Sequence, residues 1–117
     1  MLLLIEFVFF AATAIEVSQT DFPRAMDDAM MRMHEAMHVP YSGNADRDFA
    51  AMMIPHHQGA IDMAKLELQY GTDERLRRLA QGIIVEQAQE IGVMHGILDT
   101  LTAPLLKPSD PQSRTHQ

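Results

Sequence analysis

The side chains with the most distinctive chemistry are ten methionines and six histidines, in a chain of 117 residues that has no cysteine. Thioether sulfur is a soft, neutral donor that favours Cu(I) and, by the same argument, Ag(I), while imidazole binds copper in both oxidation states. The absence of thiols excludes disulfides, zinc-thiolate sites and iron–sulfur clusters. Any soft-metal site in this chain must therefore be built from methionine and histidine.

The densest group of these side chains surrounds Pro55. Met53 and His57 are four residues apart, as are Met52 and His56, so each pair shares one face of a helix. Successive helical residues diverge by about 100°, so we expect His56 to face inward and His57 to lie at the flank. Proline lacks the backbone N–H, which predicts a kink just before the two histidines.

An earlier stretch carries a methionine stripe about 60° wide on a predicted helix. Its members are Met26, Met30, Met33 and Met37, with His34 and His38 along the flank. Methionine is often a flexible core filler, and that reading competes with a metal site here. However, the stripe contains no Leu, Ile, Val or Phe, which define a packed core better. Five of these residues are therefore candidate ligands: Met30, Met33, His34, Met37 and His38.

A third stretch places Gln87, Glu90 and Met94 on or beside its apolar stripe. Burying a carboxylate is costly unless it is paired. Glu90 is therefore either the acceptor that orients a histidine N–H or a boundary residue that reaches solvent. Met94 would add a thioether from this direction, whereas His95 points about 100° away from it.

Hydrophobic spacing and capping residues predict three helices that position these groups, over about 20–39, over about 46–70, and from a cap at 72–74 through Leu101. Gly71 is placed to be a left-handed residue after the second helix. No period-two run predicts a strand, so the fold class is all-α. The short connection before the third helix predicts an antiparallel hairpin, and the first helix can complete an up-down bundle. A fourth helix would have to be the N-terminal segment or a partner chain.

The two ends of the chain differ from this bundle at residues 20–102. Residues 1–16 are mostly apolar, with Glu6 as the charged exception, and they are too short to span a membrane. They end in a small-residue pattern that suits an imperfect or truncated export signal, or they form a short helix that covers the bundle. Residues 103–117 are polar and punctuated by proline, so we expect a disordered tail.

The formal net charge is −7, which disfavours nucleic acid and anionic membrane surfaces as partners and favours cations. Thioethers also keep binding metal in oxidising compartments, where thiols are lost to disulfides. This agrees with an exported, periplasmic protein.

Two blocks of the sequence resemble a known family. They run from Asp48-Phe49 through Met53-Ile54-Pro55-His56-His57 to Met63-Ala64, and from Ile84 through Gln87-Ala88-Gln89-Glu90-Ile91 to Met94. They are similar to the ferritin-like domain of unknown function 305 family, which includes the CopM-like copper-binding proteins. The resemblance implies a periplasmic helical bundle that binds Cu(I) and Ag(I). It assigns this role to Met53, His56, His57 and Met63, with Gln87, Glu90 and Met94 opposite. This chain has Ile97 where the family often has Trp.

Two other functions compete with this one. A di-iron oxidase on a ferritin-like bundle needs two Glu-x-x-His motifs, and only Glu35 to His38 fits that pattern. A metal-free module could instead receive a partner helix in a methionine-rich groove. We expect a protein that is not an enzyme and that stores, buffers or delivers Cu(I), with a copper efflux system or a second copy as partner.

Overall fold

The computed structural model describes residues 18–102, which form three α-helices and contain no strand. A 3₁₀ turn, η1 (Gln19–Asp21), leads into α1 (Phe22–Met37), which is followed by α2 (Ala45–Tyr70) and α3 (Glu74–Thr102). The predicted all-α class is thus confirmed. The predicted export signal at 1–16 and the predicted tail at 103–117 lie outside the described residues.

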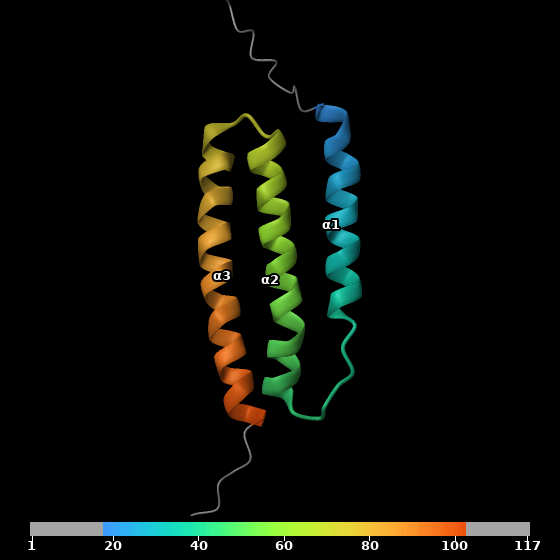
Figure 1. Ribbon diagram of the computed structural model, residues 1–117, viewed down its shortest axis with the longest axis vertical. Helices are drawn as coiled ribbons and strands as arrows, with labels where there is room; N and C mark the ends of the chain where they lie inside the picture. The colour runs from blue at the N-terminus through green and yellow to red at the C-terminus, as the bar shows by residue number, and fades with distance from the viewer. Residues whose placement is uncertain (1–17, 103–117) are drawn as a thin grey trace, which may run out of the picture.

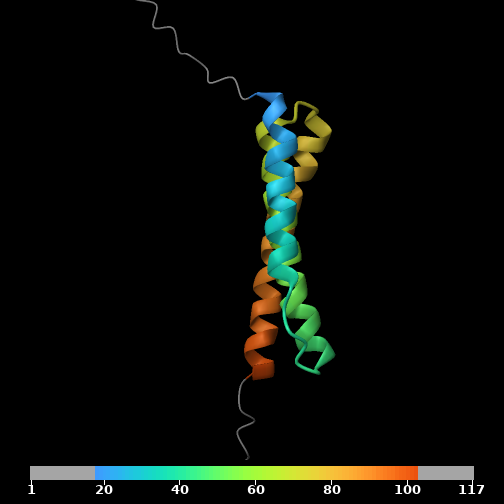
Figure 2. The ribbon, with the colours of Figure 1, turned by 90° about the vertical axis from the view of Figure 1, so that its right-hand side faces the viewer.

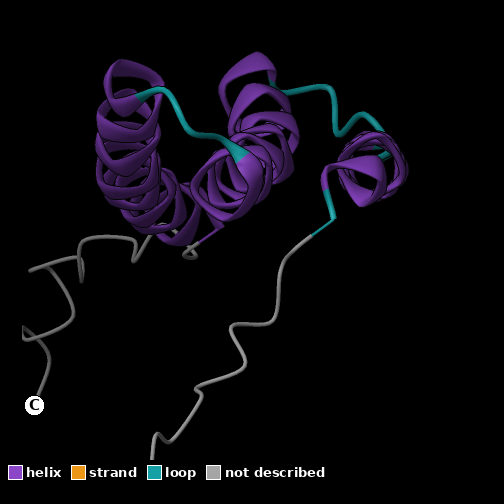
Figure 3. Ribbon diagram, turned by 90° about the horizontal axis from the view of Figure 1, so that it is seen from above, coloured by secondary structure: helices purple, strands orange, loops and turns teal. Residues whose placement is uncertain are grey.

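The three helices lie side by side as an open layer (Figure 1). α2 is in the middle and packs against α1 on one side and against α3 on the other, as the view along the helices also shows (Figure 3). The up-down order and the antiparallel second hairpin are as predicted. Because residues 18–102 contain no fourth helix, the two broad sides of α2 between its neighbours are left open in this part of the chain.

Side-chain caps explain where the second and third helices begin. Asn44 Oδ1 accepts a hydrogen bond from the Arg47 N–H at 3.0 Å at the start of α2. Asp73 Oδ1 accepts from the backbone N–H groups that open α3. Such caps satisfy donors that have no partner within the helix. α1 instead has proline in its first turn, where the missing N–H costs nothing.

The predicted left-handed conformation of Gly71 is wrong. Its φ is −75° and its ψ is 149°, which is extended backbone, and its N–H donates to the Glu67 carbonyl. Since α3 begins only three residues later, the chain must leave α2 directly toward Asp73 instead of curling back. Among the described residues, the backbone angle φ is positive at Gly43, where it is 87°. Gly43 lies in the longer connection between α1 and α2.

Pro55 does not interrupt α2, which continues as one helix from Ala45 to Tyr70. Its position within the helix removes one backbone hydrogen bond. The N-terminal part of α2, drawn in green, is tilted relative to the remainder in the side view, consistent with the predicted bend near Pro55 (Figure 2).

Small side chains form most of the helix contacts. The buried apolar residues of the described chain are Ala29, Ala50, Ile61, Ala64, Tyr70, Ala80 and Met94. Among residues 18–102 no large side chain is completely buried, as expected of a single layer of helices. The helices approach closely through alanine, while larger apolar groups remain partly in water. No helix in this part of the chain combines the length and apolar character needed to cross a membrane.

The two ends of α2 are tied to its neighbours by different groups. At its C-terminus Gln19 Nε2 donates to the Tyr70 carbonyl at 2.8 Å, and the Phe22 ring meets the Tyr70 ring edge-on. Arg77 Nη1 donates to the Leu68 carbonyl at 2.7 Å, which holds the start of α3 against α2. At the other end Ser42 donates to Asp48.

Candidate functional site

His57 is the buried imidazole in the contact between α2 and α3. It lies seven residues after Ala50 and seven before Ala64, so all three occupy the stripe of α2 that faces α3. The residue is 8% exposed, and its Nε2 lies 2.6 Å from Glu90 Oε2. A carboxylate only accepts, so Nε2 carries the proton and donates to Glu90.

The other ring nitrogen of His57 is buried and has no hydrogen-bond partner among residues 18–102. In the neutral imidazole, a proton on Nε2 leaves Nδ1 with a lone pair. An unsatisfied buried polar atom costs about 1–3 kcal/mol, which is why such atoms require an explanation. Histidines that bind metals commonly donate their second ring N–H to a carboxylate, which is the arrangement found here with Glu90.

A hollow of about 340 Å³ lies beside this histidine. It is lined by Phe49, Met53, His57, Glu90, Val93 and Met94. Met94 is buried and Met53 is partly buried, so thioethers from two different helices border the same space as the imidazole. The structure thus brings together four of the residues singled out from sequence: Met53, His57, Glu90 and Met94.

The predicted orientation of the two adjacent histidines is wrong. His57 is the buried one and His56 is exposed, with ring centroids 6.0 Å apart. The prediction assumed that the inner side of α2 is the side that carries Met53, His56 and Met63. α3 packs instead on the alanine stripe next to it, so that methionine-rich side remains open among the described residues.

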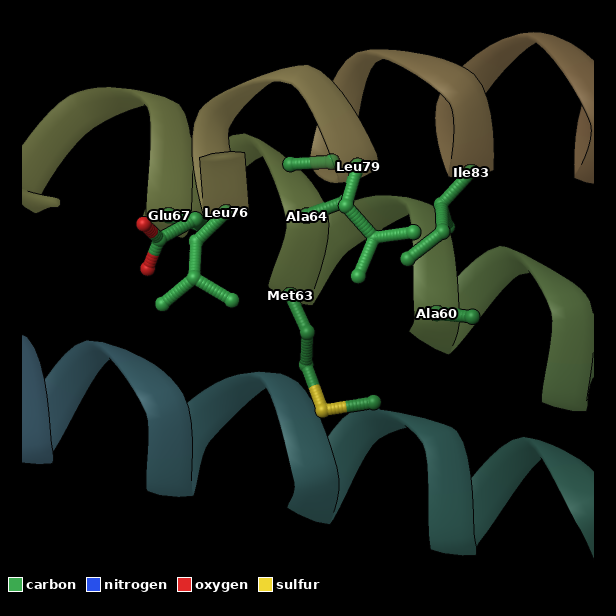
Figure 4. Close-up of a pocket in the computed structure, with 8 residues that line it drawn as sticks. Ala60, Met63, Ala64, Glu67, Leu76, Leu79 and Ile83 are labelled. Carbon is green, nitrogen blue, oxygen red and sulfur yellow. The ribbon is translucent and has the colours of Figure 1, made fainter. Parts of the chain in front are cut away.

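Met63 lies in a separate hollow of about 280 Å³, closer to the C-terminus of α2. Leu76, Leu79 and Ile83 of α3 border this space, and the Met63 thioether extends from α2 over α1 (Figure 4). Ten residues of helix separate it from Met53, which is about 15 Å along the axis. Met63 and Met53 are therefore not brought to one centre.

The methionines of α1 lie on the far side of α2 from Glu90 and Met94 (Figure 1). Met33 packs directly on Gly59, where an added Cβ would come within 2.8 Å of the Met33 Cβ. Met30 is 37% exposed and Met37 is partly buried. Because the two helices are antiparallel, Met30 lies one turn from this contact in the direction of Met63, and Met37 one turn in the opposite direction.

The remaining predicted residues do not line the His57 hollow. His34 is exposed on α1, His38 is exposed directly after the end of α1, and Gln87 is partly buried one turn before Glu90. Phe49 and Val93 do line the hollow, and sequence reasoning gave them no role. The available signal was their spacing from the predicted ligands. Phe49 lies four residues before Met53 on α2, and Val93 lies directly before Met94 on α3.

Charged donors are sparse around this hollow. In the described part of the chain no three His, Asp or Glu side chains converge on one point. The carboxyl groups with shifted pKa values, Asp73 and Asp48, do not line the hollow. Hydrogen bonds from the Arg75 side chain and backbone lower the pKa of Asp73 to about 2, and those from Ser42 lower the pKa of Asp48. The donors near His57 are therefore thioether, imidazole and a single carboxylate.

Comparison with known proteins places this architecture in a family. The profile described as Domain of unknown function (DUF305) matches residues 11–106, and the chain belongs to that family. The chain is also similar to a curated protein called Uncharacterized protein L153, from Acanthamoeba polyphaga mimivirus, with 43% identity over 54 residues. That match covers 46% of this chain and 36% of the viral protein.

Proposed function

We propose, for this member of the DUF305 family, that it binds Cu(I), and by the same chemistry Ag(I), through His57 with Met53 and Met94. The observation that carries the proposal is the buried Nδ1 of His57, which has no partner among residues 18–102 while Nε2 is held by Glu90. A neutral imidazole nitrogen and two thioethers form a donor set that suits a soft monovalent ion.

The surroundings of His57 support this assignment. Glu90 fixes the ring orientation and increases the electron density on Nδ1, which strengthens its bond to a metal. Phe49 and Val93 supply apolar walls, so water competes less well for an ion in the hollow. Met53 and Met94 are unbranched and flexible, which lets their sulfur atoms adjust to an ion of low coordination number.

The exposed and partly buried thioethers along the other side of α2 suggest a weaker, secondary region for soft ions. Met30 is exposed and Met37 is partly buried on α1, and Met63 is partly buried on α2, with His34 and His56 nearby in sequence. These side chains have no rigid partner comparable to Glu90. In our proposal they collect ions at lower affinity than the His57 hollow.

Storage, buffering or delivery of Cu(I) is the role that such a donor set serves best. Neutral donors release an ion by exchange with another thioether site, without the loss of an ionised ligand. We propose that the protein works in an oxidising, periplasmic compartment and passes its ion to a copper efflux system. Amino-terminal sequencing of the protein recovered from that compartment would test both the export and the cleavage of residues 1–16.

Competition titration with Cu(I) tests the site itself. We expect His57→Ala, and separately the double change Met53→Leu/Met94→Leu, to lower Cu(I) affinity by about tenfold or more, which corresponds to about 1.4 kcal/mol. His95→Ala and Met31→Leu are the matched controls, because both residues are exposed on surfaces away from the hollow. Unchanged affinity in both test variants would reject this site.

Metal selectivity gives a second test on the unmodified protein. A soft, neutral site binds Cu(I) and Ag(I) far more tightly than Zn²⁺ or Fe²⁺. Native mass spectrometry after equal exposure to each ion measures this directly. Comparable retention of Zn²⁺ would contradict the soft-site assignment, and iron binding with oxygen consumption would favour the di-iron oxidase.

A metal-free interaction module is the second candidate, favoured by the large apolar side chains that the layer leaves exposed. Leu79 and Val93 are 60% and 62% exposed. If the protein acts only as such a module, Cu(I) will not be retained in mass spectrometry, and the Met→Leu variants will leave partner binding unchanged because the apolar area is conserved.

A further inference from the structure

One broad side of the layer is mostly apolar, with Asp46 and Glu67 near its two ends, and we call it the open face. Its residues border consecutive hollows between α2 and α3. They are Phe49, Met53, Ala60 and Met63 on α2, and Leu76, Leu79, Ile83, Val93, Ile97 and Leu101 on α3. The three-helix layer has no other element over these side chains within residues 18–102.

The opposite side of the layer is different in character. The hollow there, between α1 and α2, is bordered by Arg32, Gln58 and Asp62. Val85, although 58% exposed, lies on the side of α3 that faces away from α2. The hollow on that side is therefore partly polar, whereas the hollows along the open face are lined mostly by apolar residues.

The dimensions of the open face match those of a stable interface. From Leu76 to Leu101 the face is about 38 Å long at 1.5 Å per residue. Two helices at the usual spacing of about 10 Å make it about 20 Å wide, or on the order of 760 Å². A standard interface takes about 800 Å² from each partner. The surface is large enough for a protein partner and is not limited to a small ligand.

In the middle of the open face an imidazole on α2 lies level with carboxylates on α3, while Asp46 and Glu67 border the hollows at the two ends. His56 lies on α2, and Glu90 lies at the same level of α3, because Glu90 bonds the neighbouring His57. Glu86 is seven residues from both Leu79 and Val93, so it shares their face. Most of the residues that border the hollows above and below this level are apolar on both helices.

We propose that a second copy of this chain covers the open face. A two-fold axis that runs parallel to the helices, between α2 and α3, places α2 of each copy over α3 of its partner. His56 of one protomer then meets Glu86 and Glu90 of the other, and the mostly apolar segments above and below this level meet each other. An axis perpendicular to the helices would instead place like groups together, which costs energy.

This arrangement turns two open layers into one core. The α2 and α3 helices of the two chains form four helices in which every neighbouring pair is antiparallel, the packing of an up-down four-helix bundle. Each α1 then flanks the bundle on the outside of its own α2. Such an isologous contact is the usual form of a homodimer. The proposed dimer does not depend on metal binding, because it is inferred only from the shape and charge of the open face.

Sedimentation velocity on the full, metal-free chain tests the proposal with a matched pair of substitutions. We expect the parent chain to be a dimer, and Val93→Glu to raise the dissociation constant at least tenfold because it buries a charge in the interface. Val85→Glu makes the same change on the same helix at similar exposure and should leave the dimer intact. Leu79→Glu, away from the His57 hollow, should act like Val93→Glu, with circular dichroism confirming folding of each variant.

A monomeric parent chain, or equal effects of Val85→Glu and Val93→Glu, would overturn the proposal. A photo-crosslinking residue at position 79 distinguishes the occupants of the open face. A product of twice the chain mass, joined to the partner's α2, supports the dimer. Crosslinking within one chain to residues 1–15 would assign the face to that apolar segment and would also overturn the proposal.

The position of the axis has a separate test. His56→Glu should weaken the dimer at least tenfold, since it places a carboxylate opposite Glu86 and Glu90 of the other copy. Adding Glu86→Lys to His56→Glu should restore association, because the charges are again opposite. If the second change fails to restore the dimer, the proposed placement of α2 over α3 is wrong.

Discussion

The two hairpins that share α2 are held together in different ways. Between α2 and α3 the connection is short, and the hydrogen bond from His57 to Glu90 joins the helices near their middle. Between α1 and α2 the connection is longer, and Met33 lies directly against Gly59. One hairpin is fixed by a directional polar pair, and the other by a flexible thioether packed on bare backbone.

This difference explains why the methionines of the two hairpins have different prospects as ligands. Beside Glu90 the imidazole has a defined orientation, so thioethers near it complete a site that is already partly formed. On α1 the thioethers have no such reference group, and Met33 is committed to the helix contact. A directional anchor, more than the number of sulfur atoms, decides which region binds an ion tightly.

Removal of the Glu90 carboxylate, which orients His57, should have the largest effect on Cu(I) affinity. Glu90→Ala frees the His57 ring, and we expect Cu(I) affinity to fall by about 10- to 100-fold, as is typical when the partner of a ligating histidine is lost. Glu90→Gln should retain most of the affinity, because its amide oxygen still accepts from Nε2. Glu86→Ala, one turn away, is the control for the loss of a negative charge. Equal losses of Cu(I) affinity in all three variants would show that the charge, and not the hydrogen bond to His57, determines the affinity.

The contact between α1 and α2 can be tested by adding one methyl group. Gly59→Ala forces the new Cβ against Met33, and overpacking of this kind costs about 1–3 kcal/mol of unfolding free energy. Chemical denaturation measures the change. The double variant Gly59→Ala/Met33→Ala should regain part of the loss because it removes the Met33 Sδ and Cγ, although the Cβ at position 33 remains 2.8 Å from the added methyl group. An unchanged stability in Gly59→Ala would show that the α1 contact is loose.

A glycine-to-alanine change on α3 should raise the unfolding free energy, whereas Gly59→Ala on α2 lowers it. Nothing lies within 4 Å of a Cβ added at Gly92, and the residue is inside the helix. Gly92→Ala should therefore stabilise the protein by about 0.5–1 kcal/mol through lower backbone entropy in the unfolded chain. The same denaturation experiment compares it with Gly59→Ala, and destabilisation at Gly92 would indicate an unseen contact there.

The smallest predicted effect is the loss of stability in acid that arises from Asp73 and Asp48, near the two connections between the helices. The pKa of Asp73 is lowered to about 2 from 3.8 by its hydrogen bonds from Arg75, so its stabilising contribution is present above pH 3.8 and is lost as pH falls toward 2. The pKa of Asp48 is lowered by Ser42, with the same sign. Asp73→Asn should flatten the acid limb of stability followed by circular dichroism. An unchanged limb would remove Asp73 as its cause.

Local signals in the sequence were sufficient for the helices and for part of the candidate site. Spacing, caps and Pro23 placed three helices close to their observed bounds, and Met53, His57, Glu90 and Met94 were all singled out. The assignment of inner and outer histidines failed because it assumed a closed bundle. Periodicity shows which side of α2 is apolar, but it does not show which side another helix covers.

The linear order of the helices has a consequence for how the chain opens. α1 packs on α2, and its first turn is tied to Tyr70 at the end of α2. Release of α1 therefore breaks none of the contacts between α2 and α3, so the protein has a partial unfolding route that leaves the second hairpin complete. Regions that open in this way exchange their amide hydrogens without global unfolding. The amides of α1 should exchange with solvent ahead of those in the middle of α2 and α3.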